Sequence, residues 1–336
     1  MSNPILVETL RGALVESRHR GAIAVVDAAG RPVLALGDVD RPVYPRSAVK
    51  AIQALPLVES GAAEKYGFGD QEVALACASH GGEPAHVEVV SRMLARAGLN
   101  SGALECGAHW PSHQPSSHAV ARSPGAPSAL HNNCSGKHAG FLCVACAAGV
   151  EHRGYVKSGH FVQAEVRSAL ESLTGVGLSV DQCGIDGCSI PTYAVSPTAL
   201  AHAFAKFGTG QGLEEKRAKA AARIRAACAA EPYYVAGTGR FCTEVMKALG
   251  ARVLVKTGAE GVFCGALPEA GLGIALKCDD GTTRAAEVAM ATMIARFLPM
   301  SEDERGALGR FLRPPLRNWN GMEVGGLRPA EALTIS

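Results

Sequence analysis

The sequence predicts an α+β fold whose main sheet is built from the two ends of the chain. Near the N-terminus, residues 21–38 carry two β-rich runs separated by a turn, and residues 251–278 near the C-terminus carry three more. The segments between them are mostly helical in pattern. We therefore expect one domain over residues 1–336, with a sheet region at about 1–45 and 240–336, helices packed on that sheet, and a mainly helical middle at about 46–239.

The first elements follow from local patterns. The stretch "GAIAVVDAAGRPVLALGD" predicts a hairpin, because two β-type runs flank the turn "DAAG". The stretch "RSAVKAIQALPLVESG" predicts a helix that opens at Ser47 and is perturbed by Pro56, since proline cannot donate a backbone hydrogen bond inside a helix.

The later elements have equally local signals. In "SPTALAHAFAKFG" we expect Ser196 to cap a helix, Pro197 to take its first position and Gly208 to close it. The runs "ARVLVKTG", "GVFCGALP" and "LGIALKC" predict three strands, and "TRAAEVAMATMIARFL" predicts the helix that follows them.

The composition excludes several classes of function. With 47% hydrophobic residues, 19% charged residues and a formal charge of +2, the chain lacks the basic excess that nucleic-acid binding requires. No 18-residue apolar segment is present, so we expect no membrane association. The N-terminus lacks a signal pattern, and we expect a cytoplasmic protein.

Eleven cysteines, an odd number, argue against a disulfide framework in a reducing compartment. Cys143 and Cys146 lie in an alanine-rich helical run and are interpreted as small core residues. Cys134 and Cys188 differ, because both lie in polar, glycine-bearing turns, "NNCSGK" and "DGCSIP".

A serine–lysine pattern points to nucleophilic catalysis. Ser47 and Lys50 in "SAVK" are three residues apart at a predicted helix start, so their side chains share one face and the lysine can act as base for the serine. Lys256 in "KTG", on a predicted strand, can supply a second cation that lowers the pKa of such a base. S-x-x-K followed by K-T-G is the signature pair of serine β-lactamases and penicillin-binding proteins, which predicts that type of α+β fold.

One part of that signature is missing, because no S-D-N tripeptide stands between the two motifs. In its place "CASHGGEPAH" offers Ser79 and His80 before a glycine pair. Together with "YPRSAVKAIQALPLVESGA", "HNNCSGKHAGFL", "GIDGCSIPTYAVS" and "VKTGAEGVFCGALP", this stretch resembles the L-asparaginase family that has a serine-β-lactamase-like fold, the third structural class of asparaginases. The resemblance covers nearly the whole chain.

The resemblance implies an enzyme that hydrolyses L-asparagine to L-aspartate and ammonia, and a homodimer. It implies two serine–lysine pairs in one cleft, Ser47 with Lys50 and Ser79 with Lys256. It also implies a zinc ion held by Cys134, Lys137 and Cys188, with water completing the shell. Cys134 and Lys137 are one helical turn apart, so they can point the same way; residue chemistry alone would favour His138 as third ligand, but the resemblance makes it a neighbour. The candidates for substrate binding are Arg46, His80, Gly81, Asn133, His138 and Asp186.

In the expected mechanism, Ser47 attacks the side-chain amide carbon, Lys50 takes its proton and passes one to the departing ammonia, and water cleaves the ester. Ser79 and Lys256 complete the proton relay, and either serine can be the nucleophile. Two alternatives remain open at this point: a penicillin-recognising hydrolase or esterase, and a non-catalytic, zinc-stabilised scaffold.

Overall fold

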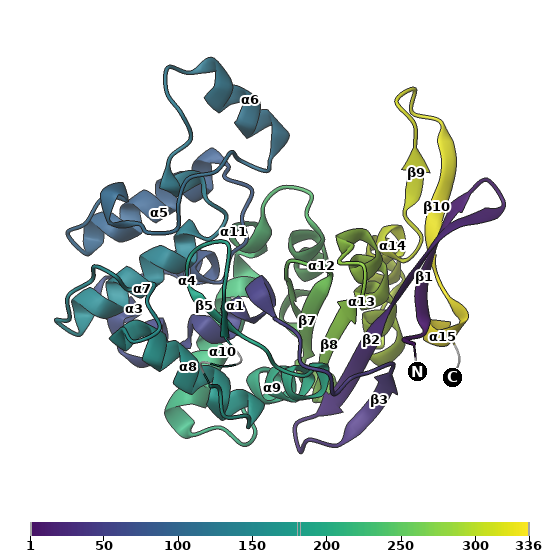
Figure 1. Cartoon of the computed structure of the whole chain (residues 1–336), viewed down its shortest axis with the longest axis horizontal. Helices are drawn as coiled ribbons and strands as arrows, with labels where there is room; N and C mark the ends of the chain where they lie inside the picture. The colour runs from purple at the N-terminus through teal and green to yellow at the C-terminus, as the bar shows by residue number, and fades with distance from the viewer. Residues whose placement is uncertain (1, 180, 182, 335–336) are drawn as a thin grey trace. The chain divides into compact units, whose positions relative to one another are not determined.

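An antiparallel sheet that joins both ends of the chain forms one of two compact units in this computed structural model (Figure 1). The structure describes residues 2–179, 181 and 183–334. The sheet unit comprises Met1–Ala48, Val195–Gly212 and Ala248–Ser336, and the helical unit comprises Val49–Ala194 and Leu213–Lys247.

The sheet has the strand order β6-β7-β8-β2-β1-β10-β9. Strand β3 pairs with the C-terminal part of β2, at residues 23–26. Every pairing is antiparallel, so β2 meets β8 with Ile23 opposite Leu276, and β1 meets β10 with Val7 opposite Pro329. The predicted α+β class with a sheet from both chain ends is therefore confirmed. The elements of this unit are β1 (Ile5–Arg11), β2 (Leu14–Asp27), β3 (Pro32–Leu36), α9 (Pro197–Thr209), η5 (Gly250–Arg252), β6 (Leu254–Thr257), β7 (Val262–Leu267), η6 (Pro268–Ala270), β8 (Leu272–Cys278), α13 (Thr283–Phe297), α14 (Glu302–Leu312), β9 (Pro315–Arg317), β10 (Glu323–Pro329) and α15 (Glu331–Thr334).

Helices α9 and α13 cover opposite faces of this sheet. A Cβ at Gly273 of β8 would lie 1.9 Å from the carbonyl oxygen of Ala201 in α9, so only glycine allows this close approach. A Cβ at Gly265 of β7 would face Met290 of α13 instead. Gly265 is opposite Ile274, the neighbour of Gly273 in β8, and adjacent strand residues point to opposite faces.

The helical unit is arranged around α7, whose residues Ser135–Ala145 are all buried. Helix α7 packs against α2, α3, α4, α5 and α8. This packing on all sides explains the apolar run that follows its polar first turn. The elements are η1 (Arg46–Val49, at the boundary with the sheet unit), α1 (Lys50–Gln53), α2 (Leu55–Glu59), α3 (Ala62–Lys65), α4 (Asp70–Ala76), α5 (Pro84–Arg96), η2 (Ser101–Ala103), α6 (Gln114–Arg122), η3 (Ala129–His131), α7 (Ser135–Ala147), α8 (Phe161–Thr174), β4 (Cys183–Ile185), β5 (Pro191–Tyr193), α10 (Glu215–Ala230), α11 (Pro232–Ala236) and α12 (Phe241–Leu249).

Several predicted boundaries need correction. The segment around Pro56 forms three short pieces, η1, α1 and α2, and it opens at Arg46 in a 3-10 turn rather than at Ser47. Helix α9 is capped by Ser196 as predicted, but it continues past Gly208 to Thr209, and the glycine that caps its end is Gly210, which has the left-handed φ of 77°. Helix α9 also belongs to the sheet unit, although its sequence lies in the predicted helical middle.

Across the described residues, no helix is long and apolar enough to cross a membrane.

Candidate active site

Lys50 occupies the centre of a polar cluster inside the helical unit. Its side chain is 0% exposed, and its Nζ lies 3.1 Å from Oγ of Ser79 and 3.1 Å from Sγ of Cys134. The carbonyl oxygen of Ala78 is its third partner. These three contacts bring the start of α1, the turn after α4 and the start of α7 together.

The turn that carries Ser79 is held by backbone hydrogen bonds from separate segments. The amide of Ser79 donates to the carbonyl of Val235 at 2.9 Å, and the amide of His80 donates to that of Asn133 at 3.3 Å. The amide of His113 donates to Gly81 at 3.0 Å. The predicted substrate residues His80, Gly81 and Asn133 therefore lie in one region with Ser79.

His80 is a buried and neutral part of this turn. Its Nδ1 accepts from the amide of Gly82 at 3.1 Å, so its Nε2–H donates to Oγ of Ser135 at 2.9 Å. Burial lowers the pKa of His80 well below its usual value, and the nearby His86 and Lys50 lower it further. His80 therefore acts here as a fixed hydrogen-bonding group rather than as a cation.

The start of α7 brings Cys134, Lys137 and Cys188 together. Nζ of Lys137 lies 3.2 Å from Sγ of Cys188, whose turn between β4 and β5 also carries Asp186. A hydrogen bond from the Cys188 thiol lowers the pKa of Cys134 well below its usual value against the opposing effect of burial, and Lys137 and Lys50 lower it further. The same hydrogen bond raises the pKa of Cys188, as does burial. The arrangement brings the two sulfurs next to the side-chain nitrogens of two buried lysines, Lys50 and Lys137.

Burial opposes the charge of Lys137, but the Cys134 and Cys188 sulfurs raise its pKa above the usual value. Within the described ranges, no group of three or more His, Cys, Asp or Glu side chains is placed to hold a metal ion. The cluster instead offers two sulfurs and an amine. Two thiolates and a deprotonated amine are donors that zinc accepts, so the donor chemistry fits the expected ion.

The sheet unit carries the other predicted residues. Lys256 lies in β6, is 1% exposed, and donates from Nζ to the carbonyl of Thr257 at 2.8 Å. A Cβ on Gly258 would lie 2.7 Å from the carbonyl oxygen of Pro45, so the "KTG" glycine lets β6 approach the segment that leads to Ser47.

Unusual backbone conformations flank two of the predicted residues. Arg46, directly before Ser47, has a φ of 51°, and Ser189, directly after Cys188, has a φ of 76°. A positive φ costs a residue with a side chain of order 1–3 kcal/mol, and such residues cluster at functional sites. This strain is consistent with function at both positions.

The sequence matches one known protein family over nearly its whole length. The sequence profile described as L-asparaginase II matches residues 7–329, which is nearly the whole chain. The chain belongs to the L-asparaginase II family. That family membership supports an amidohydrolase of the asparaginase type and implies an amide substrate. A search of curated proteins gave no match.

Solved structures similar to this L-asparaginase II family member share little sequence with it. A β-lactamase from Mycobacterium bovis is 14% identical over 83% of this chain and 95% of its own, with a TM-score of 0.42. A putative β-lactamase from Bacteroides dorei is 13% identical over 82% and 92%, with a TM-score of 0.41. The protein Mglu in its L-glutamate-binding form is 19% identical over 89% and 65%, with a TM-score of 0.40.

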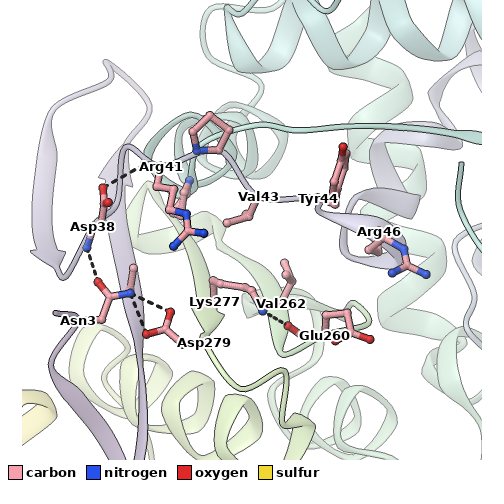
Figure 2. A pocket seen from close by; sticks show the side chains of 13 residues that line it. Asn3, Asp38, Arg41, Val43, Tyr44, Arg46, Glu260, Val262, Lys277 and Asp279 are labelled. Carbon is pink, nitrogen blue, oxygen red and sulfur yellow. Dashed lines mark hydrogen bonds between the residues drawn. The ribbon is translucent and has the colours of Figure 1, made fainter. Parts of the chain in front are cut away.

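In this family member, Arg46 lines a hollow of about 380 Å³ in the sheet unit (Figure 2). On one side of the hollow, Asn3 donates from Nδ2 to Asp279 and accepts at Oδ1 from the amide of Asp38. Of the predicted site residues, Arg46 belongs to this hollow. The remaining lining residues are Ala22, Arg41, Pro42, Val43, Tyr44, Pro197, Glu260, Val262 and Lys277.

Sequence reasoning missed two buried residues next to the predicted ones. Glu83 accepts hydrogen bonds from the amide and the hydroxyl of Thr238, at 2.9 and 2.7 Å, and from Tyr233 Oη at 3.3 Å. Tyr155 lies with its Oη 2.7 Å from Nδ1 of His138. Glu83 lies within the motif "CASHGGEPAH", so the sequence offered a signal for it as a candidate site residue. No local sequence pattern indicates Tyr155 as a site residue.

Proposed function

We propose that this protein hydrolyses L-asparagine to L-aspartate and ammonia. Family membership supports an amide substrate, and one observation in the helical unit carries the proposal: the buried amine of Lys50 lies 3.1 Å from the Ser79 hydroxyl. A serine hydroxyl is a weak nucleophile alone, and a lysine amine at hydrogen-bond distance is the base it needs.

In the proposed reaction, Lys50 accepts the proton of a serine hydroxyl while the serine oxygen bonds to the side-chain amide carbon. The C–N bond then breaks, and the nitrogen leaves as ammonia with the proton returned by Lys50. Water hydrolyses the resulting β-aspartyl ester and frees both the serine and L-aspartate. The contact between Lys50 and Ser79 favours Ser79 as this nucleophile. We propose that Ser47 and Lys256, which belong to the sheet unit, are the second serine and lysine of the proton relay.

The substrate's α-groups need a donor cluster and an acceptor. We assign that task to Arg46, Asn133, His138 and Asp186, with Gly81 and His80 shaping the turn beside Ser79. Arg46 can pair with a carboxylate in two-pronged geometry, and Asp186 can accept from an ammonium.

We propose that Cys134, Lys137 and Cys188 hold a zinc ion. Such an ion would supply a Lewis acid that polarises or positions an oxygen near the serine. Binding requires Lys137 to lose its proton, so zinc affinity should rise with pH. We propose the cytoplasm as the location, because an odd number of cysteines, eleven, suits a reducing compartment better than a disulfide framework. We also propose a homodimer, which light scattering would test.

One experiment tests the reaction and names the nucleophile. Ammonia release from L-asparagine is compared with turnover of nitrocefin, a reporter of penicillin-recognising hydrolases. Acid quenching during turnover, followed by peptide mass spectrometry, locates the aspartyl ester. We expect ammonia release and an adduct on the Ser79 peptide. An adduct on the Ser47 peptide would show that Ser47, and not Ser79, is the nucleophile. Nitrocefin turnover without ammonia release would overturn the proposed function.

A further inference from the structure

A buried hydrogen-bond chain connects Glu105, Tyr155 and His138 within the helical unit. The backbone amide of Glu105 donates to Oη of Tyr155 at 2.9 Å, and Oη lies 2.7 Å from Nδ1 of His138. Tyr155 and His138 are both 0% exposed. Gln163 donates from Nε2 to the Tyr155 carbonyl at 2.9 Å, which fixes the tyrosine backbone.

The proton positions in this chain can be deduced by counting donors and acceptors. Because the Glu105 amide must donate, Tyr155 Oη accepts that bond and keeps one proton of its own. If Tyr155 donates this proton to Nδ1 of His138, the imidazole carries its own proton on Nε2. One buried group then lacks a partner among the described residues, namely this Nε2–H.

The opposite tautomer leaves two groups without partners. If Nδ1 carried the proton and donated it to Oη, the tyrosine proton would have no acceptor, and Nε2 would be a buried acceptor without a donor. A doubly protonated ring would orphan the tyrosine proton as well and add an unpaired charge to a buried site. Each orphaned buried group forfeits a hydrogen bond that water would have made, so the first arrangement is favoured.

The residue that carries the orphaned Nε2–H, His138, follows Cys134 by about one helical turn at the start of α7. His138 is four residues after Cys134, so the two side chains share one face of the helix. Helical side chains also lean toward the N-terminus, which directs the imidazole to the turn that begins at Cys134. Cys134 is the contact of Lys50, whose amine also meets Ser79.

We propose that Tyr155 is a positioning residue that fixes His138 as the Nε2–H tautomer, so that His138 donates a hydrogen bond to an oxygen of the substrate. The inference rests on the proposed function for the identity of that substrate. It narrows the role of His138, because a fixed donor binds a carboxylate or carbonyl oxygen and cannot bind the substrate's ammonium.

The tautomer can be read directly from long-range ¹H–¹⁵N correlations of the full-length protein with ¹⁵N-labelled histidine, at a pH about two units above the usual histidine value of about 6.5. The chain provides both references. His160 accepts at Nδ1 from the Val162 amide, so its proton is on Nε2; His109 accepts at Nε2 from the Asn133 amide, so its proton is on Nδ1. His138→Gln identifies the His138 signals by their loss.

We expect His138 to show the His160 pattern, and Tyr155→Phe to change it toward the His109 pattern while kcat/KM for L-asparagine falls at least about tenfold. The control is Tyr66→Phe, because the Tyr66 hydroxyl makes no hydrogen bond within the described part of the chain. A His109 pattern in the unmodified protein would overturn the inference. So would an unchanged His138 pattern or unchanged kinetics in Tyr155→Phe.

The spectroscopic result is independent of the reaction. If the unmodified protein releases no ammonia from L-asparagine, the proposed function fails, and the His160 pattern at His138 still upholds the tautomer assignment. If the protein is active and His138 shows the His109 pattern, the tautomer assignment fails alone.

Discussion

The amine of Lys50 lies 3.1 Å from the hydroxyl of Ser79, and both residues belong to the helical unit. The S-x-x-K spacing predicts a different partner for this lysine, Ser47. Within the helical unit, the same amine also contacts the sulfur of Cys134. Lys50 therefore connects the predicted serine chemistry to the predicted metal ligands, and its loss should affect both.

The first prediction concerns this contact. If Lys50 and Ser79 act as one unit, Ser79→Ala and Lys50→Ala each lower kcat/KM for L-asparagine by at least about 10³-fold, and the double variant is scarcely slower than either. Ammonia release measures the rates. Ser91→Ala, at an exposed position of α5, is the matched control and should retain full activity. Losses that add in free energy would mean that the two residues act separately.

The second prediction concerns the metal. Cys188→Ser should lower the zinc content of protein purified without chelator and raise KM for L-asparagine more than it lowers kcat, because the proposed ion would orient the substrate. Elemental analysis and steady-state kinetics measure the two effects. Cys143→Ser, at a buried cysteine of α7, is the control for loss of a buried thiol. If the unmodified protein contains no zinc, the proposed zinc site is wrong.

The third prediction concerns pH and stability. The pKa of His80 is lowered in the folded state, so below about pH 6.5 the unfolded chain binds a proton that the folded chain does not. The free energy of unfolding should therefore fall as pH decreases, by about 1.4 kcal/mol per pH unit from this residue. Urea unfolding between pH 7.5 and 5 measures the slope.

Replacing His80 with Gln should reduce that slope, whereas His118→Gln, at an exposed position of α6, should leave it unchanged. An identical slope in His80→Gln would show that His80 does not stay neutral in the fold.

The parts of the fold that the sequence predicted well depend on local patterns. The hairpin of residues 21–38 and the strand that carries Lys256 are examples, because alternation and turn residues lie within a few positions of each other. The end of α9 was wrong by two residues, because the glycine that closes a helix is the one with left-handed φ, and Gly208 and Gly210 look alike in sequence.

The functional residues that were missed depend on distant contacts. Glu83 and Thr238 are 155 positions apart, and no periodicity links them. The hydroxyl of Tyr155 acquires its role only when α7 brings His138 beside it. Cys134, Lys137 and Cys188 were named from the family resemblance, and their proximity could not follow from spacing because Lys137 and Cys188 are 51 positions apart.

The fourth prediction concerns Glu83. Its buried carboxylate accepts from the amide and the hydroxyl of Thr238, so Glu83→Gln would place an amide NH₂ or a single oxygen opposite these donors. We expect a loss of about 1–3 kcal/mol in the free energy of unfolding, measured with urea. Glu88→Gln, at a mostly exposed position of α5, the helix that begins directly after Glu83, is the control and should change stability by less than about 0.5 kcal/mol. Equal effects of the two changes would show that the Glu83 contacts are not stabilising.

The last prediction concerns the choice between asparagine and glutamine. Asparagine carries a carboxylate and an ammonium, and if Arg46, Asn133, His138 and Asp186 hold these groups, they fix the reach of the amide carbon to the serine. Glutamine adds one methylene, which would carry its amide past the serine oxygen by roughly 1 Å, and a misplacement of that size costs about 10²-fold in rate.

Contact of the pocket with the added methylene changes binding by only about 1 to 3 kcal/mol, so the loss should appear mainly in kcat. Steady-state kinetics on both amino acids measure this. Comparable kcat/KM values would mean that the α-groups are not held at fixed points, and the assignment of these four residues to substrate binding would then be wrong.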